Sequence, residues 1–296
     1  EHLEPAGVHS GDSTAVIPPY SVNKKILKEI EEKSKKLALG LNVKGLLNIQ
    51  FAIKDEELFI LEANPRASRT MPFVAKVTGN QIIKAGTLLM LGYSIDEVRN
   101  KTKYLSSSSN KVAIKKAVFP WSRFPAEDTM LGPEMKATGE VLGVGKEFGT
   151  ALNKAYAAAG VEINNKEKGI FVTLSDNEKP NFIKTINKYI ELGFKLYSTE
   201  GTGKFLKTNG IDSVIVGKAD DLGQTSLTII EDKLVSLVIN TPTYANELSD
   251  GWKIRRLSHE TGVAVVSSVR EADAFIEAFL NQNLVLDDLE VIQDVS

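Results

Sequence analysis

The sequence contains no cysteine among its 296 residues. That absence excludes disulfide bonds, thiolate metal sites and a cysteine nucleophile. The formal net charge is only −2, with basic residues spread along the chain, so composition does not favour nucleic acid or an anionic membrane as a partner. No apolar run approaches the ~20 residues that a membrane helix needs, and no signal peptide is visible. These absences predict a cytoplasmic protein.

The length of 296 residues and the apolar content of 42% are enough for two hydrophobic cores, so we expect two domains. The chain begins with Glu1 instead of methionine, inside what has the pattern of a domain. We therefore expect a fragment of a longer protein.

The most informative stretch is residues 48–70, where two apolar runs flank a polar segment at residues 55–57. This pattern predicts an antiparallel hairpin. Gln50, Glu62 and Asn64 have the same parity, so they can share one face of the hairpin. Gln50 can lie opposite Glu62 only if the loop has an odd number of residues, as a loop at 55–57 would. A two-residue turn would place the two side chains on opposite faces.

A carboxylate and two amides beside Arg66 and Arg69 are hard oxygen ligands next to cations, a combination that suits Mg²⁺ bound to a polyphosphate. The alternative is a solvated hairpin face that ends in a polar loop, and the spacing alone does not decide between the two.

The residue identities in this stretch favour the metal site. LEANPR at residues 61–66, after NIQFA at residues 48–52, resembles the metal-binding end of the ATP-grasp ligases. The continuation ASRTMPFVAKVTGN, residues 67–80, resembles the second ATP-grasp half of carbamoyl-phosphate synthetase large subunits, and biotin carboxylases continue differently. FP, LGPEM and TGE within residues 124–140 also resemble that family.

The resemblance implies roles for individual residues. Gln50, Glu62 and Asn64 would bind Mg²⁺ or Mn²⁺, with Glu62 and Arg66 as the catalytic pair and Arg66 on the transferred phosphoryl group. Gln50 and Glu62 would also contact ATP, together with the stretch Gly7, Val8, His9 and Ser10. Glu4 and Asp12 match carboxylates that bind an effector amine in some family members.

Helical patterns cover residues 23–39, 71–90 and 147–159 of the first part, and residues 112–119 form a strand pattern. We interpret residues 121–145 as an ordered connection, and residues 160–168 as the boundary between domains at 1–160 and 161–296.

From Gly169 the pattern changes to short β-branched apolar runs at residues 169–175, 194–199, 212–217, 233–240 and 263–268. Helical patterns separate several of them, at residues 179–192, 204–209 and 270–280. This alternation predicts a parallel sheet covered on both faces, and ligands of such sheets bind at the carboxyl ends of the strands. The polar residues expected there are Lys179, Thr199, Thr202, Lys218 and Asn240. Thr199 and Thr202 precede or open a helix, where backbone N–H groups bind anions.

This second part resembles the methylglyoxal synthase-like domain that ends carbamoyl-phosphate synthetase large subunits. True methylglyoxal synthases need a catalytic carboxylate in the stretch that matches Asn240-Thr241-Pro242-Thr243, and amide and hydroxyl groups cannot replace a carboxylate base. The expected fold class is therefore α/β: the C-terminal portion of an α+β ATP-grasp domain with an antiparallel sheet, followed by a Rossmann-like parallel-sheet domain that binds without catalysing.

The family resemblance implies a ligase that phosphorylates carbamate with ATP, for arginine or pyrimidine biosynthesis, with a glutaminase small subunit as partner. It also implies a phosphorylated effector, such as a nucleoside monophosphate or phosphoribosyl pyrophosphate, and an oligomer formed through the C-terminal domain. Ornithine is the less favoured effector, because relatives that respond to it have a carboxylate where this sequence has Lys116. The fragment alone is expected to be inactive. The alternatives are a non-catalytic, nucleotide-sensing regulatory module and, less favoured, a methylglyoxal synthase-like lyase.

Overall fold

The computed structural model of the chain describes residues 1–103, 111–124, 127–161, 163, 168–241 and 249–281. Contacts divide the chain into two compact units. Among the described residues, the first comprises Glu1 and Val16–Ala113, and the second comprises His2–Ala15 and the residues from Ile114 onward. The division predicted between residues 160 and 161 falls inside the second unit, and as a division between family domains it stays a prediction.

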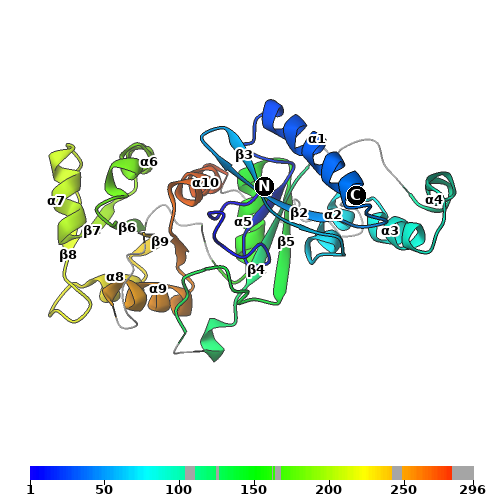
Figure 1. The fold of residues 1–296 in the computed structure, drawn as a ribbon. Helices are drawn as coiled ribbons and strands as arrows, with labels where there is room; N and C mark the ends of the chain where they lie inside the picture. The colour runs from blue at the N-terminus through cyan, green and yellow to red at the C-terminus, as the bar shows by residue number, and fades with distance from the viewer. Residues whose placement is uncertain (104–110, 125–126, 162, 164–167, 242–248, 282–296) are drawn as a thin grey trace. The chain divides into compact units, whose positions relative to one another are not determined.

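Among its described residues, the first unit combines an antiparallel hairpin with the helices α1 to α4 (Figure 1). The long helix α1 lies along the hairpin, and the Lys33 ammonium donates to the Leu58 carbonyl 3.1 Å away. The side chain of Asn23 caps α1 by accepting from the Ile26 N–H. The elements are α1 (Lys24–Gly40), β2 (Asn48–Lys54), β3 (Glu57–Asn64), α2 (Thr70–Thr78), α3 (Ile82–Met90) and α4 (Ile95–Lys101).

The single helix predicted over residues 71–90 is wrong, because the structure has two helices there. Gly79 follows α2 with a φ of 67°, in the left-handed region that glycine adopts without steric cost. That residue ends the helix before α3 begins.

A small sheet has the strand order β1-β4-β5. Its strands are β1 (Ala15–Ile17), β4 (Val112–Val118) and β5 (Gly139–Gly145). We predicted β4 but interpreted residues 139–145 as part of a connection, which is wrong. Gly143 explains the glycine-rich sequence of β5: a Cβ there would lie 2.2 Å from the Ala151 carbonyl oxygen, so only glycine lets α5 (Phe148–Ala158) pack so closely.

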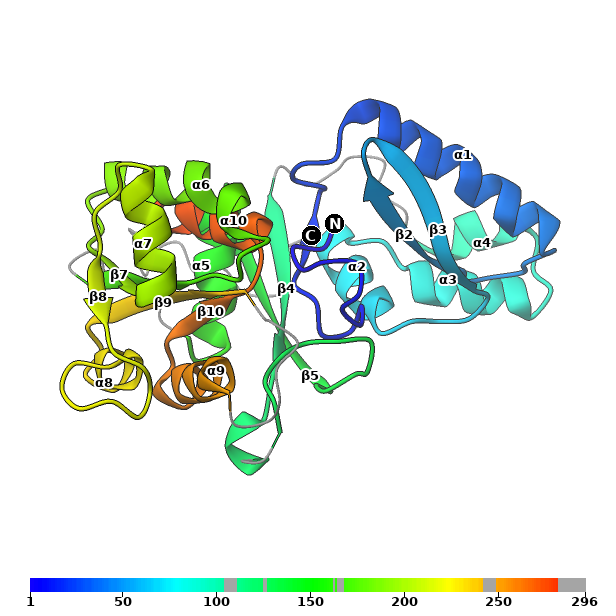
Figure 2. The same ribbon diagram turned by 60° about the vertical axis from the view of Figure 1, so that its left-hand side comes forward.

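The second unit is built around a five-stranded sheet with the order β10-β9-β6-β7-β8. Every adjacent pair in it is parallel, which confirms the predicted fold class. Figure 2 shows α6, α7 and α10 on one side of this sheet and α8 and α9 on the other. The elements are β6 (Gly169–Thr173), α6 (Lys179–Glu191), β7 (Leu196–Thr199), α7 (Glu200–Thr208), β8 (Val214–Val216), α8 (Ser226–Glu231), β9 (Val235–Asn240), α9 (Asp250–Thr261), β10 (Ala264–Val266), α10 (Val269–Leu280) and the short 3-10 helix η1 (Trp121–Arg123).

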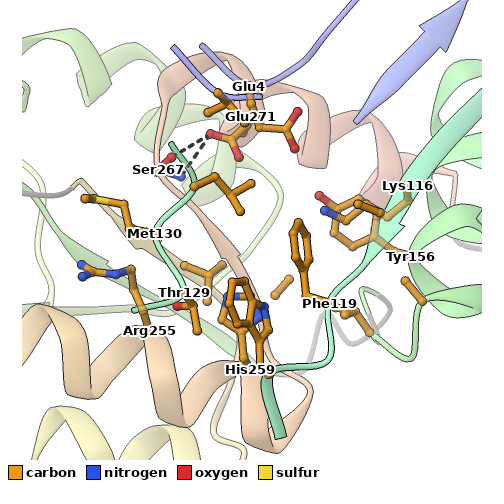
Figure 3. A pocket seen from close by; sticks show the side chains of 18 of the residues that line it. Glu4, Lys116, Phe119, Thr129, Met130, Tyr156, Arg255, His259, Ser267 and Glu271 are labelled. Carbon is orange, nitrogen blue, oxygen red and sulfur yellow. Dashed lines mark hydrogen bonds between the residues drawn. The ribbon is translucent and has the colours of Figure 1, made fainter. Parts of the chain in front are cut away.

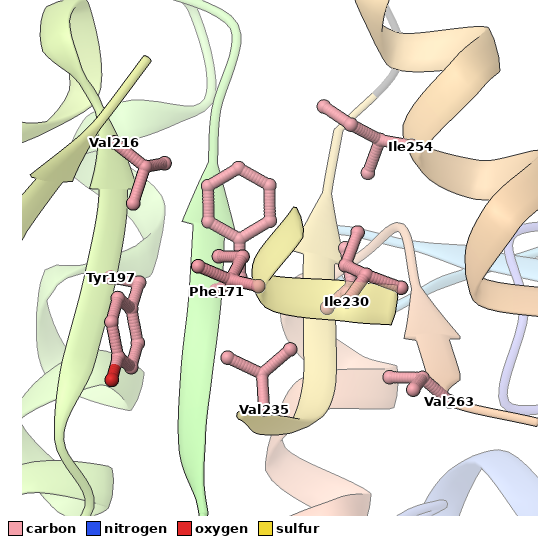
Figure 4. Close-up of a cluster of buried hydrophobic side chains, with 9 residues drawn as sticks. Phe171, Tyr197, Val216, Ile230, Val235, Ile254 and Val263 are labelled. Atoms are coloured by element: carbon pink, nitrogen blue, oxygen red, sulfur yellow. The ribbon is translucent and has the colours of Figure 1, made fainter. Parts of the chain in front are cut away.

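The sheet is buried on both faces, as its apolar runs require. On one face, Phe171 and Val238 pack against Ile230 of α8 and Ile254 of α9 (Figure 4). On the other, Tyr189 of α6 and Phe279 of α10 are fully buried, with ring centroids 6.1 Å apart. These two layers fix the carboxyl edge of the sheet, where the predicted effector residues lie.

Candidate active site and effector site

The hairpin turn is shorter than expected. β2 ends at Lys54 and β3 begins at Glu57, so Asp55 and Glu56 alone form the turn. Both have positive φ angles, 50° and 62°, as a two-residue hairpin turn with the native strand twist requires. The predicted odd-numbered loop is therefore wrong, and an unbroken ladder from this turn would place Gln50 opposite Leu61.

A β-bulge restores the predicted pairing. Phe51 pairs with Ile60, whereas Gln50 pairs with Glu62, so Leu61 is an extra residue in β3. Directly opposite residues in a ladder point to the same face. The prediction that Gln50 and Glu62 share a face is confirmed, but the bulge achieves it and not the loop. Bulges of this kind redirect side chains next to functional sites.

The same register adds a residue that the sequence analysis missed. Asn48 pairs with Asn64, and both lie two residues from the central pair along their strands. Asn48, Gln50, Glu62 and Asn64 therefore line one face. A signal was present in the sequence, since Asn48 has the same parity as the predicted ligands.

These four side chains offer one carboxylate oxygen pair and three amide oxygens, and such hard ligands fit Mg²⁺ or Mn²⁺. Glu62 is exposed, and Gln50 and Asn64 are half-buried. Within the described ranges, no group of three His, Cys, Asp or Glu residues could hold a metal ion. A site here would therefore depend on amide ligands and on the oxygens of a bound phosphate.

Arg66 follows directly after β3, and its side chain is exposed. Its backbone N–H donates to the Asn64 carbonyl at 2.8 Å, and its Nη1 donates to the Ala67 carbonyl at 3.0 Å. The remaining guanidinium nitrogens can form the bidentate contacts that phosphate groups favour. Arg69 precedes α2, so both arginines lie close to the end of the strand that carries Glu62.

The predicted nucleotide-contacting loop, Gly7 to Ser10, belongs to the second unit. The His9 N–H donates to the Gly132 carbonyl at 2.7 Å, and its Nδ1 accepts from the Gly11 N–H. The buried Lys115 ammonium donates to the carbonyls of Gly11 and Ser10 at 2.9 and 3.4 Å. Backbone contacts of this kind hold the loop in one conformation.

Glu4 and Asp12 also hold this loop. Asp12 is fully buried and accepts from the N–H groups of Lys136 and Ala137 at 2.6 and 3.0 Å. Glu4 accepts from the Ser13 hydroxyl and from both the N–H and the hydroxyl of Thr14, at 2.6–2.7 Å. Both carboxylates therefore have structural partners that the sequence did not reveal.

The predicted effector residues lie at one edge of the parallel sheet. Thr199 ends β7 and Asn240 ends β9, on either side of β6. Lys179 opens α6 after β6, and its Nζ would lie 3.9 Å from a Cβ placed on Gly201, in the first turn of α7. Lys218 follows β8. Parallel strands bring their carboxyl ends together, so a phosphate group here would face two ammonium groups and a helix N-terminus.

Several of these residues also have internal partners. The Lys179 ammonium donates to the Asp176 carboxylate at 2.5 Å. Thr202 is buried, and its hydroxyl accepts from the Leu174 N–H at 3.0 Å and from the Thr199 hydroxyl at 3.2 Å. The Asn240 amide oxygen accepts from Arg255 Nη1 at 2.9 Å. The sequence analysis missed Arg255, because it did not predict α9. The part of the stretch at Pro242-Thr243 lies outside the described residues.

Electrostatics in the second unit distinguish two further side chains. Burial lowers the pKa of His259 to about 4. Burial raises the pKa of Glu271 to about 7, and the nearby Glu4 carboxylate adds to the effect. His259 is therefore neutral at physiological pH, whereas Glu271 titrates near neutrality.

Comparison with known proteins agrees with this architecture. A family model described as the carbamoyl-phosphate synthase L chain, ATP binding domain, matches residues 2–98. Another, the MGS-like domain, matches residues 181–267. No helix among the described residues is long and apolar enough to cross a membrane.

Comparisons with curated proteins give relatives that match nearly the whole of this chain. A carbamoyl phosphate synthase large chain, C-terminal section, from Aquifex aeolicus is 41% identical over 292 residues, which cover 94% of this chain and 54% of the relative. The corresponding section from Methanocaldococcus jannaschii is 40% identical, covering 94% and 46%. The large chain of Archaeoglobus fulgidus is 40% identical, covering 100% and 28%. The chain thus spans about half the length of the first two relatives, or less in the third. Together these matches show that the chain is similar, over nearly its whole length, to part of the carbamoyl phosphate synthase large chains.

Proposed function

We propose that this chain is part of a glutamine-dependent carbamoyl phosphate synthase and contributes to the phosphorylation of carbamate by ATP. In that reaction a carbamate oxygen attacks the γ-phosphorus, the bond to the ADP oxygen breaks, and ADP leaves. Catalysis of phosphoryl transfer depends on positioning and charge stabilisation and needs no protein nucleophile. The chain's exposed Arg66 and single carboxylate among amides suit that task.

The observation that carries the proposal is the bulge at Leu61, which brings Glu62 opposite Gln50. Bulges are over-represented next to active sites, where they re-aim a side chain. Gln50, Glu62 and Asn64 would hold Mg²⁺ or Mn²⁺, and the cation would neutralise charge on the nucleotide phosphates. Arg66 would bind the transferred phosphoryl group, and the backbone of Gly7 to Ser10 would contact the nucleotide.

The test uses the longer protein that contains this chain, together with a glutaminase subunit, which we propose supplies the ammonia. Glu62→Gln keeps the shape of the side chain and removes its charge, so carbamoyl phosphate synthesis should fall by orders of magnitude. Glu57→Gln is the matched control, because Glu57 is an exposed glutamate of the same strand next to the turn. If the Glu62→Gln variant makes carbamoyl phosphate at the wild-type rate at the Mg²⁺ concentration of the standard assay, the proposal is contradicted.

For the second unit we propose binding of a phosphorylated effector, such as a nucleoside monophosphate or phosphoribosyl pyrophosphate, at the edge formed by Lys179, Thr199, Thr202, Lys218 and Asn240. The approach of Lys179 to the first turn of α7 supports this site. Calorimetric titration should give binding that Lys179→Ala weakens and Lys184→Ala, on the same helix, does not. Equal affinity in all three proteins would place the effector elsewhere.

The same site supports the alternative of a regulatory module that senses nucleotides without catalysing. Lyase activity of the methylglyoxal synthase kind has less support, because Asn240 is an amide held by Arg255 and not a carboxylate base. Service to arginine or pyrimidine synthesis, a cytoplasmic location, and oligomerisation through the C-terminal domain are parts of the same proposal.

A further inference from the structure

Arg255 of α9 joins two parts of the second unit to which the proposed function gives separate tasks. Figure 3 shows its side chain at the wall of a cavity, on the same side as Met130. The buried guanidinium donates from Nη1 to the amide oxygen of Asn240 at 2.9 Å. Its Nε and Nη2 donate to the Asp128 carboxylate at 2.7–3.2 Å. One guanidinium is thus shared between the carboxyl edge of the parallel sheet and the segment at residues 127–137.

The segment at residues 127–137 holds the loop at residues 7–12, which carries the proposed nucleotide contacts. Within the segment, the Gly132 carbonyl accepts from the His9 N–H at 2.7 Å. At its end, two backbone N–H groups donate to the buried Asp12 carboxylate at 2.6 and 3.0 Å. Hydrogen bonds to a charged acceptor are among the stronger ones. The position of the loop therefore depends on the position of this segment.

Asp128 connects Arg255 to the rest of this segment. Its Oδ1 accepts from the Met130 N–H at 3.0 Å, and its backbone carbonyl accepts from Lys136 Nζ at 2.9 Å. The backbone N–H of the same Lys136 is one of the two that bind the loop carboxylate. Because the guanidinium of Arg255 holds the Asp128 side chain, a shift of that guanidinium reaches the loop through Asp128 and the segment.

A negative charge at Asn240 would compete with Asp128 for Arg255. All three guanidinium nitrogens already donate hydrogen bonds. The group is planar and rigid, so it cannot turn towards an anion at Asn240 without lengthening its bonds to Asp128. An anion at Asn240 also repels the Asp128 carboxylate, and burial strengthens that repulsion. Both effects loosen the hold of Arg255 on the segment.

We propose that Arg255 is a positioning residue for the loop at residues 7–12 and couples this loop to Asn240, so that a negative charge at Asn240 loosens the loop. The inference rests on the proposed function only for the identity of the two ligands, a phosphorylated effector at Asn240 and ATP at the loop. With these ligands the effector weakens ATP binding, and by thermodynamic linkage ATP weakens effector binding by the same factor.

Asn240→Asp introduces the charge with little change of shape, so amide hydrogen exchange of the full chain, followed by NMR, tests the coupling without a ligand. The reporters are the amides of His9, Lys136 and Ala137, which form the hydrogen bonds between the segment and the loop. Each should exchange at least tenfold faster in Asn240→Asp. The Ile170 amide, hydrogen-bonded within the parallel sheet, reports the stability of the whole unit and should change less than threefold.

Two further backgrounds separate coupling from a general loss of stability. Asp128→Ala combined with Arg255→Met removes the connection and leaves no unpaired charge. In that background, Asn240→Asp should change reporter exchange, relative to the Ile170 amide, less than twofold. Arg256→Lys is the matched control, because Arg256 is also buried in α9 and donates to two carbonyls of the η1 segment at 2.7 and 2.8 Å, but its hydrogen bonds among the described residues do not include Asn240. In this second background the tenfold effect should persist.

In the longer protein, Asn240→Asp should raise the KM for ATP at least threefold, and by a larger factor than it changes kcat, because a looser loop affects nucleotide binding first. Faster exchange with an unchanged KM would support the coupling and refute the proposed contact of the loop with the nucleotide. Unchanged or slower exchange in Asn240→Asp would overturn the inference and leave that contact standing. An equal effect in the background that lacks Arg255 would also overturn it.

Discussion

Removing the Asp128 carboxylate should destabilise the second unit strongly. Arg255 is 7% exposed, and its guanidinium donates to Asp128 at 3.2, 3.0 and 2.7 Å and to Asn240 at 2.9 Å. Asp128→Ala leaves this charge buried with one neutral acceptor. Breaking a buried ion pair costs about 3–5 kcal/mol. Because the Asp128 side chain is 27% exposed and Asn240 remains, we expect the lower end, about 3 kcal/mol.

Urea unfolding followed by tryptophan fluorescence measures this loss selectively. Trp121 and Trp252 are the only two tryptophans of the chain, and both belong to the second unit. Asp128→Ala combined with Arg255→Met should recover most of the loss, since the double variant has no unpaired charge. Glu200→Ala, which breaks the exposed pair with Lys204, should leave the unfolding midpoint unchanged. A loss below about 1 kcal/mol for Asp128→Ala would refute the reasoning.

Other predictions follow from single side chains. Asp12→Ala leaves two buried N–H groups without an acceptor and should cost at least about 2 kcal/mol of unfolding free energy in the same urea assay. Glu56→Gly relieves a positive φ in the hairpin turn, and slower amide exchange in β2 and β3 would show the gain. The raised pKa of Glu271 stabilises the fold below pH 4.5 and loses that effect as pH rises through about 7, so Glu271→Gln should have a higher Tm than the wild type above pH 7. The lowered pKa of His259 has the opposite pH dependence: the neutral side chain contributes stability above pH 6.5, and this contribution is lost as pH falls towards 4. The Tm of His259→Phe should therefore decrease less than that of the wild type from pH 7 to pH 5.

The parallel sheet was largely predictable, because strands buried on both faces are continuous β-branched runs. Each of the five predicted runs contains one strand of the sheet, from β6 at Gly169 to β10. The helix α9 was missed for the opposite reason. Arg255 and Arg256 are buried residues of this helix, and only pairing with distant groups such as Asp128 makes that burial tolerable. A sequence does not show which charges will be paired.

The candidate site was predicted through an incorrect intermediate step. Parity correctly grouped Gln50, Glu62 and Asn64, but the expected three-residue loop does not exist. The extra residue lies at Leu61, inside a strand whose alternation gives no local sign of it. A bulge and a longer loop change the register by the same one residue, so the pattern could not distinguish them.

The most direct test of the account asks whether Gln50 and Glu62 act together across the hairpin. A double-mutant cycle in the longer protein would measure carbamoyl phosphate synthesis for Gln50→Ala, Glu62→Gln and the double variant over a range of Mg²⁺ concentrations. If the two side chains share one ion, the double variant should be little worse than Glu62→Gln alone. Full additivity of the two losses, with an unchanged Mg²⁺ dependence in each single variant, would contradict a shared site.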